Sequence, residues 1–146
     1  MLLLPFGVFA QSTVEGIVVD KVSSQPIPGV NVVIQGAANG TQTDFDGKFK
    51  LSKVKKGDKI VFTSLRSGDL ELYTMNLDGS DVKQITFDLG YDGGAFFSPD
   101  GTQLIFRASR PKTPEAIAEY KELLSQGLVK PTDMELFVCN VDGSNL

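Results

Sequence analysis

The chain has 146 residues and a formal net charge of −4, and 41% of its residues are hydrophobic and 22% charged. This is the composition of an ordinary globular protein with one domain or two small ones. Nucleic-acid binding is disfavoured because it needs clustered cations, and the only short basic group is Lys53, Lys55 and Lys56. No apolar run reaches the ~20 residues of a membrane span. With no histidine and the single Cys139, an internal disulfide is excluded and the commonest general base and metal ligand are missing.

The first ten residues, MLLLPFGVFA, form an apolar stretch that ends in a small residue. This pattern predicts the apolar core and cleavage site of a secretory signal, cut after Ala10, although the usual positive charges are missing. The alternative is a buried first strand, which Pro5 and Gly7 disfavour. A cleaved signal places the mature protein in the periplasm or outside the cell.

Short β-strands are expected through the first part of the chain, because apolar and polar residues alternate between turn-forming clusters. The last two strands before residue 52 are predicted to pair as a hairpin around the Asp44-Phe45-Asp46-Gly47 turn. The predicted strands are Thr13–Asp20, Val30–Ile34, Thr41–Thr43, Lys48–Leu51 and Ile60–Thr63.

The second part of the chain also reads as β-structure, with a glycine-rich loop in its middle. Residues 89–94 (LGYDGG) are predicted to be a flexible loop, and residues 98–101 (SPDG) a type I turn. The predicted strands are Leu70–Leu77, Val82–Phe87, Ala95–Phe97, Gln103–Ala108 and Met134–Val141.

One helix is predicted at about residues 113–126, within an insertion over residues 111–131. Thr113 can cap it, Pro114 fits the first turn, and Gly127 ends it. An apolar stripe runs along it at helical spacing: Ile117, Tyr120 and Leu124. The stripe is expected to pack against the protein's own sheets, which is the usual role of such a face.

Two stretches of the second part repeat each other. Residues 70–80 (LELYTMNLDGS) and 134–144 (MELFVCNVDGS) are identical at six of eleven positions and apolar in both at four more. Residues 60–66 (IVFTSLR) and 104–110 (LIFRASR) form a second pair. Repeats of ~40–45 residues built from short strands are typical of propeller blades. No counterpart of residues 82–86 (VKQIT) follows the second copy, so an unpaired strand edge is expected at Met134–Val141.

The N-terminal part resembles the carboxypeptidase-regulatory-like domain of TonB-dependent receptors of the SusC type. The resemblance rests on VEGIVVD, on QPIPGVNVVIQGAANGTQTDFDGKFKL and on KKGDKIVFT, over about residues 13–63. It implies a small transthyretin-like β-sandwich over residues 11–62, truncated relative to the family, which would continue with further strands. The implied location is periplasmic or associated with the outer membrane.

The C-terminal part resembles TolB-like β-propeller repeats over residues 59–146. The resemblance rests on DKIVFTSLRSGDLELYTMNLDGSDVKQIT and on FFSPDGTQLIFRASRP. It implies a mainly β fold in which the sandwich is followed by one or two incomplete propeller-type blades with the inserted helix. The two resemblances overlap at residues 56–64, KGDKIVFTS. A natural fusion at a shared strand and a recombined or designed chimera both explain this overlap.

Three residues are candidates for contacts, and no catalytic, cofactor or metal site is predicted. Arg66 and Arg110 repeat at an offset of 44, which suits either loop arginines that bind an anionic ligand or, preferably, a structural salt bridge in each blade. Asp92 lies in the glycine-rich loop. Cys139 aligns with Met75 and is expected to be a buried thiol without catalytic activation.

The first functional hypothesis is a non-enzymatic, exported binding or interaction module of a Gram-negative cell envelope. Its partner would be a protein or a glycan, and it would self-associate through the open edge at Met134–Val141. The second is an accessory, non-catalytic fragment of a larger exported hydrolase or of a TonB-dependent receptor. A third is that the chain has no evolved function as a unit.

Overall fold

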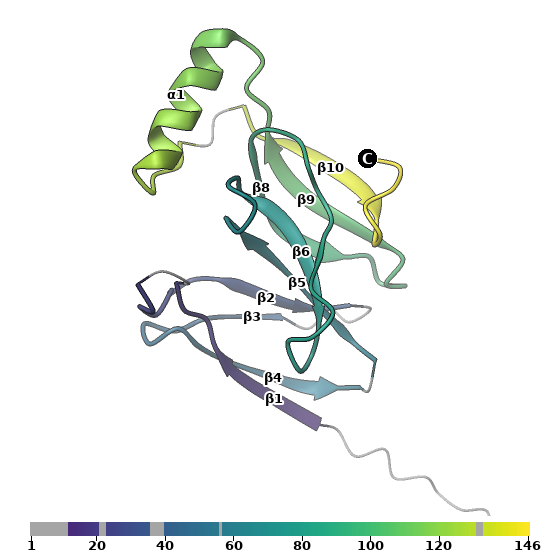
Figure 1. Ribbon diagram of the computed structural model, residues 1–146. Coiled ribbons are helices and arrows are strands. Elements are labelled where there is room, and N and C mark those ends of the chain that lie inside the picture. Colours follow the sequence, from purple (N-terminus) through teal and green to yellow (C-terminus); the bar gives the residue numbers. More distant parts are fainter. Residues whose placement is uncertain (1–11, 21–22, 36–39, 56, 131–132) are drawn as a thin grey trace, which may run out of the picture.

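The computed structural model describes residues 12–20, 23–35, 40–55, 57–130 and 133–146, so the predicted signal at residues 1–10 lies outside the described residues. The described residues form a mainly β structure with one helix and three antiparallel sheets (Figure 1). This confirms the predicted fold class at the level of its secondary structure. No sheet of the described part closes on itself.

The central sheet has five strands and contains residues from both parts of the chain. Its order is β3-β2-β5-β6-β7, so β5 pairs with β2 on one side and with β6 on the other. The strand that both resemblances share therefore joins the two parts through backbone hydrogen bonds. The strands are β2 (Asn31–Ile34), β3 (Gly40–Gln42), β5 (Lys59–Ser64), β6 (Glu71–Asn76) and β7 (Lys83–Gln84).

A smaller sheet lies on each face of the central sheet, as Figure 1 shows. On one face, β1 (Ser12–Ile17) pairs with β4 (Lys48–Val54). On the other face, β9 (Gln103–Ser109) pairs with both β8 (Tyr91–Phe97) and β10 (Glu135–Asn140).

Alternation along the central strands divides the core into two clusters, because successive side chains of a strand point to opposite faces. In β2, Val33 packs toward β8–β10, whereas its neighbour Ile34 packs toward β4. The cluster under β8–β10 contains Val33, Val61, Leu72, Ile85, Ala95, Leu104, Phe106, Ala108 and Cys139. The cluster under β1 and β4 contains Val32, Ile34, Leu51, Val54 and Ile60.

The prediction of a flexible loop at residues 89–94 is wrong, because most of it belongs to strand β8. The glycines of this segment allow neighbouring backbone to approach closely. Gly90 has φ +140°, and a Cβ there would lie 2.0 Å from the carbonyl oxygen of Ser109. Gly94 has φ +62° and lies in the irregular stretch of the β8–β9 ladder between Gly93 and Phe96.

The predicted hairpin of residues 41–43 with 48–51 is also wrong. The turn itself forms: Gly47 has φ +69° and its N–H donates to the carbonyl oxygen of Asp44 at 2.9 Å. The strands on either side belong to different layers, because β3 pairs with β2 and β4 pairs with β1. Leu51 of β4 then packs across the core against the central sheet instead of lying beside it.

The predicted helix is confirmed as α1 (Pro114–Ser125). The Oγ1 atom of Thr113 accepts from the N–H of Ala116 at 3.2 Å, and beyond the last turn Leu128 N donates to Leu123 O at 2.9 Å. No residue of α1 is buried, so the expected packing of its apolar stripe is only partly realised: Ile117, Tyr120 and Leu124 are half-buried. In the described part of the chain, no helix has the length and apolar character needed to cross a membrane.

Candidate functional site

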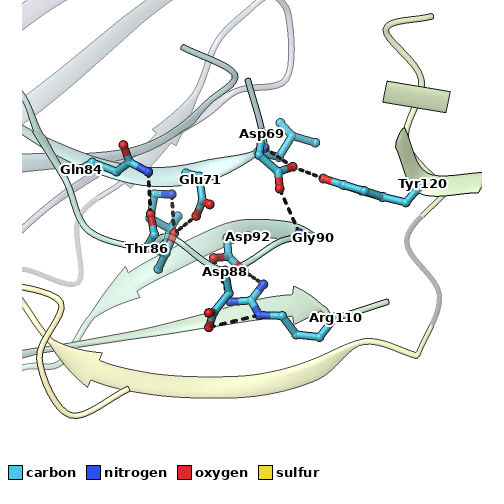
Figure 2. A network of polar contacts seen from close by, with 11 residues as sticks. Asp69, Glu71, Gln84, Thr86, Asp88, Gly90, Asp92, Arg110 and Tyr120 are labelled. Atoms are coloured by element: carbon cyan, nitrogen blue, oxygen red, sulfur yellow. Dashed lines mark hydrogen bonds and ion pairs between the residues drawn. The ribbon is translucent and has the colours of Figure 1, made fainter. Parts of the chain in front are cut away.

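A polar network lies where β6, β8 and β9 meet the inserted helix, and it contains two of the three candidate residues (Figure 2). Its side chains come from the segment before β6, from β6 itself, from the segment before β8, from β8, from the residue that follows β9 and from α1. We call it the polar network and define it as Asp69, Glu71, Thr86, Asp92, Arg110 and Tyr120.

An ion pair between Asp92 and Arg110 forms the first of three parts of the polar network. Asp92 is 0% exposed, and its two carboxylate oxygens accept from the two terminal nitrogens of Arg110, one of them at 2.9 Å. The guanidinium Nε also lies 3.7 Å from an oxygen of the exposed Asp88, and its carbon lies 5.3 Å from the ring centre of Phe137. Such a bidentate ion pair offsets the cost of removing the Asp92 charge from water, and it holds β8 against the end of β9.

The buried carboxyl group of Glu71, paired with Thr86, forms the second part. It is 3% exposed and accepts from the hydroxyl of Thr86 at 2.5 Å. Thr86 in turn accepts from the N–H of Leu72 at 2.9 Å. Burial raises the pKa of Glu71 to about 7, the nearby charges of Asp92 and Asp69 act in the same direction, and the Thr86 hydrogen bond opposes them. Glu71 is thus the group of this network with a titration near neutral pH.

The third part of the polar network attaches helix α1 to the sheets through the hydroxyl group of Tyr120. The Tyr120 OH donates to Oδ1 of Asp69, which also accepts from the N–H of Leu70 at 2.8 Å, while Oδ2 accepts from the N–H of Gly90 at 3.0 Å. Burial, followed by the contact with Asp69, raises the pKa of the Tyr120 phenol, so it remains a donor. Beside this contact lies an open groove of about 420 Å³ between α1 and the turn before β6, with Leu89, Lys121 and Leu124 among its lining residues.

The carboxyl groups of the polar network bond to other residues of the network or to backbone amides. The Asp92 carboxylate is engaged by Arg110, the Glu71 carboxyl by Thr86, and Asp69 by Tyr120 and backbone amides. Within the described residues, no group of three or more His, Cys, Asp or Glu side chains is placed to hold a metal ion. The arrangement therefore suits a fixed junction between strands and helix.

The third candidate residue, Arg66, lies away from the polar network. Its guanidinium carbon is 5.0 Å from the ring centre of Phe62 and 4.9 Å from that of Tyr73, and its Nε donates to Ser64 at 3.1 Å. The structure thus brings Arg110 and Asp92 together and leaves the exposed Arg66 stacked on the half-buried Phe62 and the buried Tyr73. A contact role for the three residues stays a prediction.

Sequence reasoning did not single out Asp69, Glu71, Thr86 or Tyr120. Glu71 repeats as Glu135 in two similar strands, which does not distinguish it, and Tyr120 was assigned to the packing stripe of the helix. The expected buried thiol is present: Cys139 is 1% exposed, and burial raises the pKa of its thiol. The Asp44 carboxylate stabilises its own turn, accepting from the N–H groups of Asp46 and Lys48.

A second feature is the apolar outer face of the β8–β9–β10 sheet, which we call the outer face. It carries four large apolar side chains that alternate with the buried residues of the same strands. Their exposed fractions are 54% for Phe96, 41% for Ile105, 71% for Leu136 and 47% for Val138. The four positions adjoin one another across the ladder, because Ile105 pairs with both Phe96 and Val138, and Leu136 follows on β10. The outer face is therefore a candidate contact surface.

Comparisons with known proteins place the N-terminal strands in a known family. The family described as "CarboxypepD_reg-like domain" matches residues 14–89, which run from β1 to β7 and past the boundary at residue 62 expected from the sequence. The TonB-dependent receptor SusC of Bacteroides thetaiotaomicron is 51% identical over 61 residues, which cover 41% of this chain and 6% of the receptor. The TonB-dependent receptor P39 of Formosa agariphila is 43% identical over 54 residues, which cover 37% of this chain and 5% of the receptor.

The chain therefore matches only about a twentieth of the length of these relatives. Among solved structures, a putative TolB from Agrobacterium tumefaciens is similar with a TM-score of 0.48 and 20% identity, over 73% of this chain and 39% of that one. That likeness supports no conclusion about the fold, so the propeller-type arrangement stays a prediction. With the family match over more than half of its residues, the chain belongs to the CarboxypepD_reg-like domain family.

Proposed function

We propose that this chain is a non-enzymatic interaction module of a Gram-negative cell envelope, of the kind that TonB-dependent receptors carry. The observation that carries the proposal is the 51% identity to SusC over 61 residues. The internal pairing of the polar network supports it too, because the titratable groups there are engaged with one another. In this proposal the protein contributes contacts, and any transport belongs to other parts of a receptor.

The contact element in this proposal is the outer edge of β10. Among the described residues β10 pairs with β9 alone, and the ladder runs from Glu135 to Asn140 without a bulge. The strand ELFVCN contains neither proline nor lysine, the residues that usually protect an edge. Such an edge is a template for the addition of a further strand.

The first copy of the repeat indicates which backbone groups face that edge. In β6, which corresponds to β10, the carbonyl oxygen of Leu72 accepts from the N–H of Ile85 at 2.8 Å, and β7 continues the sheet. Leu136 occupies the position of Leu72 in the second copy. The backbone carbonyl oxygen of Leu136 therefore faces the free edge of β10, where it can accept from a strand that resembles residues 82–86.

The test adds a peptide with the sequence of residues 80–87 to the full-length, 15N-labelled protein. The proposal expects saturable shifts in the amide resonances of β10 and slower exchange of its outward-facing amides. The matched control is the same peptide with alternate backbone nitrogens methylated, which cannot donate to the edge and should not bind. Absence of saturable shifts in β10, or equal binding of both peptides, would contradict the proposed contact element.

A further inference from the structure

Two hairpins of the molecule, β5–β6 and β9–β10, repeat each other in register as well as in sequence. In the first, β5 pairs with β6 so that Val61 lies opposite Thr74. In the second, β9 pairs with β10 so that Ile105 lies opposite Val138. These are corresponding positions, at offsets of 44 and 64 in the two repeat pairs. The two hairpins therefore present corresponding side chains on corresponding faces.

The turns that follow β6 and β10 repeat the same hydrogen bonds. In the first, the Asn76 amide donates to the Ser80 hydroxyl at 2.9 Å, and that hydroxyl donates to Asp78 at 2.6 Å. In the second, Asn140 and Ser144 form the first bond at 2.8 Å, and Ser144 bonds to its aspartate at 2.7 Å. The correspondence thus extends through the turn to the atoms of its side chains.

The first strand of the repeat is supplied differently in the two copies. In the second copy β8 pairs with β9, with Phe96 opposite Ile105. In the first copy the same place is taken by β2 of the N-terminal part, with Val33 opposite Val61. Since Val61 corresponds to Ile105, Val33 takes the position of Phe96, although it comes from another part of the chain.

The same face of the repeat is buried in the first copy and exposed in the second. In the first copy the face is buried, with exposed fractions of 5% for Val33, 1% for Val61, 1% for Leu72 and 4% for Thr74. In the second copy the corresponding residues make up the outer face, with exposed fractions of 54% for Phe96, 41% for Ile105, 71% for Leu136 and 47% for Val138. The side chains remain apolar in the copy where nothing in the described residues covers them.

The first copy shows what covers such a face. Its residues pack against the inner side of the second copy, where Leu104, Phe106 and Cys139 are each at most 1% exposed. A second molecule of this chain cannot offer that surface, because its own central sheet already covers it. In the first copy, the matching inner side, which includes Ile60, packs under β1 and β4.

We propose that the outer face binds an antiparallel β-sheet of the same repeat type, stacked as the second copy stacks on the first. The inference rests on the proposed function, because it names the class of partner that an interaction module of this kind takes. The partner presents apolar side chains at the positions of Leu104, Phe106 and Cys139. The contact is heterologous: the inner side of the partner's sheet packs against the outer face of this chain, so two different surfaces meet.

The test supplies this partner in the same polypeptide, by adding a copy of residues 83–146 directly after Leu146. This continues the repeat, because Leu146 corresponds to Val82 at the offset of 64. The probe is Ile105→Cys in the original copy, with Cys139→Ala in both copies, and the readout is the alkylation rate of the probe with iodoacetamide. Ile105 lies on β9, which already has strands on both sides, so the probe reports on the face and not on the free edge.

The added repeat is expected to slow alkylation of Ile105→Cys at least ten-fold relative to the single chain. A matched probe, Phe45→Cys, lies on a turn where the native side chain is 94% exposed, and its rate should be equal in both proteins. Phe96→Lys should lower the urea midpoint of the extended protein and leave that of the single chain unchanged.

Three results would overturn the inference. One is an equal alkylation rate of Ile105→Cys with and without the added repeat. Another is digestion of the added residues by protease as an unfolded tail, because the outer face should support their folding. The third is protection in the single chain that grows with protein concentration, which would assign the face to a second copy. The peptide test adds a single strand and no sheet, and the Ile105→Cys probe lies on β9 and does not report on the β10 edge, so the two proposals can fail separately.

Discussion

Glu71 and Glu135 occupy the same position in the two copies of the repeat, yet Glu71 is buried in the polar network and Glu135 is exposed on the edge strand. Arg66 and Arg110 form a similar pair, since the exposed Arg66 stacks on the rings of Phe62 and Tyr73, whereas Arg110 forms an ion pair with a fully buried aspartate. The comparison teaches that the place of a copy in the stack of sheets, more than its residues, decides what those residues do.

The largest expected effect separates the two arginines. Arg110→Ala leaves the Asp92 carboxylate buried without its partner, which should cost about 3 kcal/mol or more of unfolding free energy. Arg66→Ala removes only an exposed contact with two rings and should cost less than about 1 kcal/mol. Urea unfolding of both variants gives the comparison. Similar losses of unfolding free energy in the two variants would mean that water reaches the Asp92–Arg110 pair in solution.

Two leucines sharpen the comparison between the buried and exposed faces. Leu72 is 1% exposed and its counterpart Leu136 is 71% exposed. Leu72→Ala should cost about 2–5 kcal/mol because it leaves a cavity between two sheets. Leu136→Ala should change stability by about 0.5 kcal/mol or less. If the protein itself covered the outer face in solution, the two losses would be alike.

The pH dependence of stability should distinguish Glu71 from Glu135. The pKa of Glu71 is raised from 4.5 to about 7 in the folded protein. Between these values the folded state keeps a proton that the unfolded state releases, so stability falls as pH rises from about 4.5 to 7. The full effect is on the order of 3 kcal/mol, at 1.36 kcal/mol per pKa unit.

Glu71→Gln should remove this part of the pH dependence and stabilise the protein above pH 7. Glu135→Gln, at the corresponding exposed position, is the matched control and should leave the profile unchanged. Chemical denaturation at pH 5, 6, 7 and 8 measures both. A wild-type stability that rises over this range would contradict the burial of an uncharged Glu71.

The smallest expected effect concerns the inserted helix, which has no counterpart in the first copy. Thr113→Ala removes the side chain that caps α1 and should cost about 1 kcal/mol. Since no residue of α1 is buried, the loss should be local. Hydrogen exchange should accelerate in α1 and remain unchanged in β5 and β6. Equal acceleration throughout would show that the helix supports the sheets.

The fold was predictable as far as it depends on local pattern. Alternation identified nearly every strand, and Thr113, Pro114 and Gly127 bounded the helix, because these signals act within a few residues. Pairing between layers was not predictable in the same way. The turn at Asp44 looks identical whether the next strand joins the same sheet or the opposite one. Residues 89–94 likewise look flexible, although their glycines allow close contact between strands.

The candidate site was predictable only in part, for a related reason. Arg110 and Asp92 were singled out from a repeat and from a loop, but their pairing depends on the register of β8 against β9. The contact of Tyr120 with Asp69 joins residues 51 positions apart, which no local pattern encodes. Position in the stack also separates Glu71 from Glu135, although the sequence around them is nearly the same.

The central claim of this account is that strands from both parts of the chain form one folding unit through the central sheet. Native-state hydrogen exchange at increasing urea tests it most directly. We predict that amides of β2, β5, β6 and β9 exchange through one opening, with the free energy of global unfolding. Exchange from β8, β9 and β10 at a clearly lower free energy, with β2 and β5 still protected, would contradict it and divide the protein into two independent units.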